Sequence, residues 1–145
     1  MTSYVSAELR RLVELRAYFL CEYCLIHAED TYLGCHVDHI IAEKHGGLTH
    51  AENLSLACAF CNRAKGSDLG SIATSTGQLT RFYHPRSDLW REHFQLDGIH
   101  IRPRTDIGQV TATILEFNAD ERLFEREALQ RIGRYPPVEA IHFIA

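Results

Sequence analysis

The fold of this chain is decided by residues 21–66, which read CEYCLIHAEDTYLGCHVDHIIAEKHGGLTHAENLSLACAFCNRAKG. This stretch contains two C-x-x-C pairs, Cys21 with Cys24 and Cys58 with Cys61. Four thiolates in such spacing are typical of a structural zinc site, which leaves no ligand position open for chemistry. We therefore expect a bound zinc ion to stabilise the fold, and the polar residues between the two pairs to form the functional site.

Two other roles for paired cysteines are open. Buried thiols serve as small apolar side chains in many cores, and C-x-x-C pairs also act as redox dithiols. The paired spacing favours zinc over simple burial, and two pairs that frame one strand–strand–helix pattern speak against redox chemistry. The fifth cysteine, Cys35, stands outside this spacing, and we expect it to be a small buried apolar residue.

Length and composition limit the class of protein. A chain of 145 residues is long enough to bury a core. Its longest strongly apolar run, residues 54–61, is too short to span a membrane, and the N-terminus lacks the layout of a signal peptide. Four cysteines in metal-type spacing, with one left over, fit a reducing compartment, so we expect a cytoplasmic protein that binds no membrane. The formal charge of −4 means that any binding of nucleic acid must come from a local patch.

The residues around the cysteines predict the order strand, loop, strand, helix. Residues 34–41 and 53–57 are rich in apolar and β-branched side chains, which indicates two strands. Residues 60–65 then predict a short helix that ends at Gly66. We therefore expect an α+β protein whose residues 1–80 form one domain with the zinc site, followed by an α-rich C-terminal lobe at residues 81–145.

The flanking segments carry weaker signals. Apolar spacings of three and four residues, caps and turn residues predict further elements. These are a helix from Ser6 to Cys21, a surface connection at 66–77, a short strand at 95–102, a helix from Thr105 to Phe117, and a helix to Ile132 that starts at Asn118 with Glu121.

The polar residues between the cysteine pairs supply the parts for phosphodiester hydrolysis. Asp38 and His39 are neighbours at the end of a predicted strand, so they point in different directions. The Asp38 carboxylate and the Asn62 amide oxygen are hard ligands that suit Mg²⁺ or Mn²⁺. His39 can take a proton from an attacking water, and the Asn53 amide can hold the backbone next to His39.

Nearby cations complete this set. Arg63 and Lys65 offer contacts to phosphate, and Lys44 and Arg81 are expected to extend the patch. Each feature also has a simpler explanation: a solvated helix face for the cations, a turn for Asp38 and His39, and a cap for Asn53. Glu43 and His45 could supply an auxiliary ligand or a substrate contact, but we interpret them, together with His36, as surface residues and leave them outside the site.

The stretch from Cys21 to Gly66 resembles the HNH endonucleases, which have a zinc-stapled ββα-metal fold. The resemblance rests on C-x-x-C, VDHII, HGG, NL and C-x-x-CN-x-x-KG in that order. It implies that His39 is the general base, that Asp38 and Asn62 bind the catalytic metal, and that Asn53 orients the His39 loop. Other members carry a histidine in place of Asn62, although the Asn form also occurs. Residues 76–94 resemble the tail of a bacterial subgroup of small HNH proteins.

The resemblance implies metal-dependent hydrolysis of DNA phosphodiester bonds, with structural Zn²⁺ and catalytic Mg²⁺ or Mn²⁺. Two alternatives are an inactive zinc module that binds nucleic acid or protein, and a nuclease directed at RNA. A pure binding module has no need of a histidine beside a hard-metal ligand, so the retained Asp38, His39, Asn53 and Asn62 favour an active enzyme.

Overall fold

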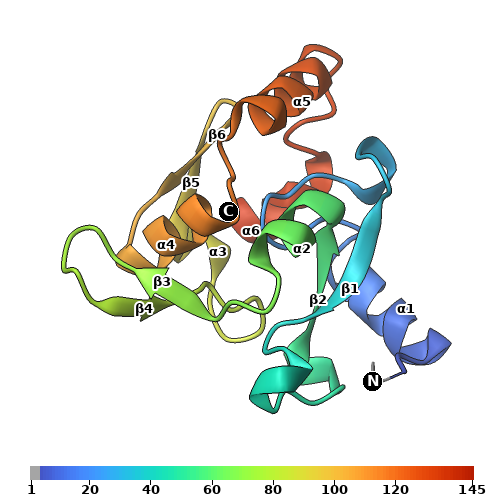
Figure 1. Ribbon diagram of the computed structural model, residues 1–145. Coiled ribbons are helices and arrows are strands. Elements are labelled where there is room, and N and C mark those ends of the chain that lie inside the picture. Colours follow the sequence, from blue (N-terminus) through green and yellow to red (C-terminus); the bar gives the residue numbers. More distant parts are fainter. Residues whose placement is uncertain (1–3) are drawn as a thin grey trace.

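The computed structural model describes residues 4–145 and has a mixed α+β architecture, as the sequence predicts (Figure 1). The helices are α1 (Ala7–Arg16), α2 (Ala59–Lys65), α3 (Trp90–His93), α4 (Asp106–Ile114), α5 (Asp120–Arg131) and α6 (Ile141–Ile144). The strands are β1 (Cys35–His39), β2 (Leu54–Cys58), β3 (Gly70–Ile72), β4 (Leu79–Arg81), β5 (Phe94–Asp97) and β6 (His100–Pro103). They pair as antiparallel hairpins, β1 with β2, β3 with β4, and β5 with β6.

The β1–β2 hairpin and α2 form the predicted ββα unit. The register pairs Cys35 with Cys58 and His39 with Leu54, so the second cysteine pair begins where β2 ends. Both α1 and α2 pack against this hairpin, and β2 is buried along its whole length (Figure 1). The two predicted strands and the helix are confirmed, and the helix ends at Gly66, whose φ of 52° suits glycine.

Helix α1 ends earlier than the sequence predicts. Its start is confirmed, because the Ser6 side chain accepts a hydrogen bond from the Leu9 N–H at 3.1 Å. The predicted end at Cys21 is wrong, since the helix stops at Arg16 and Tyr18 and Phe19 adopt left-handed backbone angles of 55° and 60° in φ. This turn releases the chain from the helix before it enters the first cysteine pair.

Three predictions beyond α2 need correction. Residues 66–77 are more than a surface connection, because they contain β3, and the strand predicted at 95–102 is the β5–β6 hairpin. Asn118 does not cap a helix: its side chain accepts from the Ile101 N–H and donates to the Ile101 carbonyl, at 3.0 and 2.9 Å. Thr105 caps α4 as predicted, with a hydrogen bond from the Gly108 N–H.

One cluster of buried side chains joins the ββα unit to the C-terminal residues. It contains the four paired cysteines together with apolar residues from both parts of the chain, including Trp90, Phe94, Ile101, Leu115 and Phe117. Strand β4 also crosses the boundary predicted after residue 80. The C-terminal segment therefore packs on the cysteine site. Within residues 4–145, the helices are all too short or too polar to cross a bilayer.

Candidate functional site

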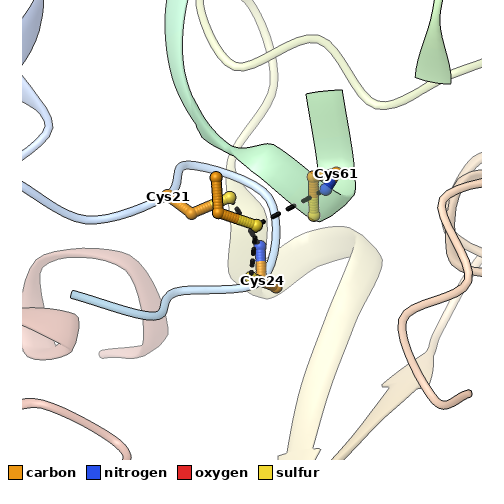
Figure 2. Close-up of side chains that lie close together, drawn as sticks. Cys21, Cys24 and Cys61 are labelled. Atoms are coloured by element: carbon orange, nitrogen blue, oxygen red, sulfur yellow. Dashed lines mark hydrogen bonds between the residues drawn. The ribbon is translucent and has the colours of Figure 1, made fainter. Parts of the chain in front are cut away.

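The structure brings the four predicted zinc ligands together. Cys21 and Cys24 lie on the loop after α1, and Cys61 lies on α2 (Figure 2). Cys58 ends β2. All four are buried, and their sulfur atoms lie within 4.8 Å of one another. The N–H groups of Cys24 and Cys61 point at the sulfurs of Cys21 and Cys58, at 3.5 and 3.4 Å. These contacts fold each C-x-x-C pair around its own sulfurs and turn the two pairs toward a common centre.

The electrostatics of this cluster fit a soft divalent cation. Burial raises the pKa of the Cys21 and Cys61 thiols well above the usual range, because a buried thiolate lacks solvation. Hydrogen bonds from the other three thiols hold the pKa of Cys24 well below it. The protein alone therefore does not stabilise four thiolates, whereas a bound Zn²⁺ would displace their protons and be enclosed by four soft ligands. The cluster can hold a structural metal such as zinc.

His39 is the last residue of β1, and its imidazole ring is held by contacts to one nitrogen atom, Nε2. Its Nε2 lies 2.9 Å from the Thr49 hydroxyl and 3.5 Å from the Glu43 Oε1. Glu43 lies in the 3₁₀ turn η2 (Glu43–His45), so the loop after β1 folds back over the ring. Glu43 was expected at the surface from the sequence, although its spacing of four residues from His39 was a signal for a contact. Nothing in the sequence pointed to Thr49.

Asn53 holds the backbone beside His39, as expected from the sequence. It ends the 3₁₀ turn η3 (Ala51–Asn53), and its Oδ1 accepts a hydrogen bond from the Ile41 N–H at 2.9 Å. Its Nδ2 donates to the carbonyls of Ile41 and Leu48, at 2.9 and 2.8 Å. A Cβ atom at Gly47 would overlap the Ile41 carbonyl, so this close approach requires glycine. One amide side chain thus closes the loop that carries His39.

Asp38 faces a buried ammonium group. The Lys65 Nζ lies 3.0 Å from the Asp38 Oδ2 and donates to the His39 carbonyl at 3.1 Å. Lys65 is only 2% exposed, which does not fit the phosphate contact expected of it. Burial raises the pKa of Asp38, and the charge of Lys65 partly opposes this. The Asp38 Oδ2 is buried, and the Lys65 ammonium is the cation that meets it in the part of the chain that the structure describes.

The remaining predicted residues lie on α2. Asn62 is partly buried in the helix, and its side chain makes no hydrogen bond to any residue between 4 and 145. Lys65 follows Asn62 by three residues, so both lie on the same face of α2. Arg63 is exposed, with its guanidinium 5.8 Å from the centre of the Phe60 ring. Arg81 forms a two-point ion pair with Asp88, so Arg63 is the more available cation.

A comparison with known families agrees with this geometry. Residues 21–68 match the family model for HNH endonucleases, and this segment contains both cysteine pairs, β1, β2 and α2. No curated protein and no solved structure matches the chain. Residues 21–68 therefore match the HNH endonuclease family over a ββα unit built around a four-cysteine site, and a C-terminal segment packs against that site.

Proposed function

We propose that this protein is a metal-dependent endonuclease that hydrolyses DNA phosphodiester bonds. The observation that carries the proposal is the placement of His39 in an HNH-type domain. The ring stands at the end of β1 beside Asp38, its Nε2 contacts Thr49, and Asn53 fixes the loop that follows. A histidine held in this way, next to a carboxylate suited to a hard metal, can act as the general base that activates water.

In this proposal, His39 is the general base. Thr49 and Glu43 engage Nε2 and fix the orientation of the ring, which leaves Nδ1 to take the proton from water. The Glu43 carboxylate, 3.5 Å away, also stabilises the positive charge that the ring gains with the proton. Asn53 is a positioning residue, because it fixes the backbone around His39 and does not itself take part in the proton transfer.

Asp38 and Asn62 would hold the catalytic Mg²⁺ or Mn²⁺ in this proposal. Carboxylate and amide oxygens are the ligands that these ions prefer, and within residues 4–145 the Asn62 side chain makes no hydrogen bond that would occupy its oxygen. When bound, the ion supplies positive charge to the scissile phosphate and to the leaving oxygen. The Lys65 ammonium compensates the buried negative charge of Asp38 and holds its carboxylate in place.

The test is cleavage of supercoiled plasmid by the zinc-loaded protein, with Mg²⁺ or Mn²⁺ added or withheld. We expect nicked or linear product only with the added ion, and loss of cleavage in Asp38→Asn and Asn62→Ala. Asp68→Asn is the matched control, because Asp68 is exposed just beyond α2, and it should cleave like the wild type. Cleavage that persists after mild chelation, with zinc still bound, would remove the hard-metal assignment.

The same assay distinguishes the alternatives. A single-stranded RNA and a plasmid are offered under identical conditions, because a site that grips phosphate does not by itself select the sugar. Cleavage of RNA alone would make the enzyme a ribonuclease. Binding of the RNA or of the plasmid, with neither of them cleaved, would identify an inactive zinc module.

A further inference from the structure

A buried cation from the C-terminal segment contacts the four-cysteine site. Arg122 lies on α5 and is 3% exposed. Its Nη2 lies 3.3 Å from the sulfur of Cys61 and 3.7 Å from that of Cys58. Its Nη1 donates to the Leu115 carbonyl at 3.2 Å, and its guanidinium sits 5.2 Å from the centre of the Phe60 ring. The guanidinium is thereby fixed with one edge against the second cysteine pair.

The charge of Arg122 needs an anion at this position. A guanidinium stays protonated in proteins, and burying it without a negative partner is costly. Among residues 4–145, no carboxylate lies within ion-pair distance of Arg122, and its hydrogen-bond and ring partners besides the sulfurs are neutral; the Glu125 carboxylate interacts with it at longer range. A zinc ion with four thiolates carries a net double negative charge, and Arg122 touches two of the four sulfurs. The cation and the metal site therefore compensate one another.

The first cysteine pair is also held by the C-terminal segment. The Tyr135 hydroxyl donates to the Cys24 carbonyl at 2.8 Å, and the Trp90 Nε1 donates to the Tyr23 carbonyl at 2.9 Å. Tyr135 and Trp90 are both buried. Hydrogen bonds to the backbone of a C-x-x-C loop fix the direction in which its sulfurs point. Both cysteine pairs thus receive polar contacts from residues beyond 81.

We propose that Arg122 is a positioning and charge-compensating residue of the zinc site, and that residues 82–145 complete this site. The inference rests on zinc binding by the four cysteines and is independent of any nuclease activity. It assigns the C-terminal segment a role: α5 docks with its cation on the metal-bound thiolates. Metal binding and the docking of α5 are then coupled, and each strengthens the other.

The first test uses full-length variants at Arg122. Outer groups that hydrogen-bond metal ligands are typically worth about 10–100-fold in metal affinity. We expect Arg122→Gln to lose zinc affinity by about this factor in competition with a chelator, and Arg122→Lys to retain more. With Co²⁺ as a spectroscopic probe, the sulfur-to-cobalt charge-transfer band should move to longer wavelength in Arg122→Gln, since sulfurs without the cation are more electron-rich.

Arg126→Gln is the matched control. Arg126 lies one turn along α5 and is 1% exposed, but it donates to the carbonyls of Ile99 and Phe117 and touches no sulfur; its guanidinium approaches the site only through the Tyr135 ring, 5.7 Å away. Its loss should lower the melting temperature without moving the cobalt band. An unmoved band in Arg122→Gln, or an equal shift in both variants, would overturn the assignment of Arg122.

A second measurement needs no variant and decides the coupling if Arg122→Gln does not fold. Hydrogen exchange of the wild-type protein is compared with zinc bound and after chelation. We expect the amides of α5, Asp120–Arg131, to lose protection together with those of the cysteine loops. Unchanged protection of α5 after loss of zinc would show that the C-terminal segment folds independently of the metal, and would refute the coupling.

Discussion

Lys65 and Asp38 form a buried ion pair at the centre of the candidate site. The ammonium and carboxylate groups are 3.0 Å apart, and their side chains are 2% and 12% exposed. Burying either charge alone is unfavourable, so each group is tolerated because the other is present. Lys65 also donates to the His39 carbonyl, which ties the end of β1 to α2. The pair therefore links the stability of the ββα unit to the site.

Removing one partner should be strongly destabilising. We expect Lys65→Met to lower the free energy of unfolding by about 3–5 kcal/mol, because Asp38 is left as an uncompensated buried charge. The double variant Lys65→Met, Asp38→Asn should recover part of this loss, since it removes both charges. Denaturant unfolding is measured for the zinc-loaded wild type, the two single variants and the double variant, which together form a double-mutant cycle.

The control for this cycle is Lys44→Met. Lys44 is exposed in η2, and its loss should change the free energy of unfolding by less than about 0.5 kcal/mol. If the effects of Lys65→Met and Asp38→Asn simply add, the two side chains are not energetically coupled, and the role given to Lys65 is wrong.

At this scale the sequence predicts what depends on spacing. The four cysteines are found together because C-x-x-C pairs encode their geometry locally, and the Asn53 contact was expected from its place at the start of the second strand. The burial of Lys65 could not be predicted, because lysine on a short helix is usually solvated. Its partner, Asp38, lies on strand β1 and not on the same helix. Thr49 was missed for the same reason: its hydroxyl meets His39 only when the loop folds back.

Among the elements, the loop between β4 and α3 is organised by one carboxylate. Asp88 accepts hydrogen bonds from the Arg81 guanidinium at 2.7 and 3.0 Å and from the His84 N–H at 2.8 Å. Burial raises the pKa of Asp88, but these hydrogen bonds outweigh it and hold the pKa below its ordinary value. The loop is the part of residues 76–94 that connects the β3–β4 hairpin to the C-terminal core.

This shift predicts the direction of a pH effect. Because the pKa of Asp88 is lower in the folded than in the unfolded protein, its stabilisation is present above the unfolded pKa of about 3.9. It is lost as pH falls from there through the folded pKa, where the carboxylate takes up a proton. We expect the difference in free energy of unfolding between the wild type and Asp88→Asn to shrink over this window.

Chemical unfolding of the two proteins side by side, at a series of pH values down through this window, makes the comparison. Loss of metal at low pH affects both proteins and cancels in the difference. A difference that grows as the pH falls would contradict the assigned role of Asp88.

Element boundaries were predicted well where one residue dictates them. Ser6, Thr105 and Gly66 act through their own side chain or backbone freedom, and the structure confirms each. The end of α1 was missed because Tyr18 and Phe19 take left-handed angles that their residue types do not favour, and only tertiary packing selects them. Asn118 was misread because the backbone of β6 competed for its amide.

Across the whole molecule, the charge distribution limits how DNA can be bound. The chain has a formal charge of −4, so affinity must rest on a few cations near the site. The structure leaves Arg63 and Lys44 exposed, while Lys65 is buried and Arg81 is paired with Asp88. Few phosphate contacts imply weak binding with a shallow salt dependence.

Salt titrations of duplex binding test this expectation. Each lost phosphate contact should reduce the slope of log K against log salt by about 0.9, so Arg63→Ala combined with Lys44→Ala should reduce it by up to about 1.8. Arg131→Ala on α5 is the control, because Arg131 is exposed and forms an ion pair with Glu127. An unchanged slope in the double variant would place the DNA on another surface.

The central claim is that His39 activates water in an HNH-type nuclease. Its most direct test is the plasmid cleavage rate of His39→Ala, measured in Mg²⁺ on protein shown to contain zinc and to melt like the wild type. His36→Ala is the matched control, since His36 lies on the same strand and is exposed. We predict a loss of about 10²–10⁴-fold for His39→Ala, with His36→Ala close to the wild type. Cleavage by His39→Ala at the wild-type rate would contradict the account.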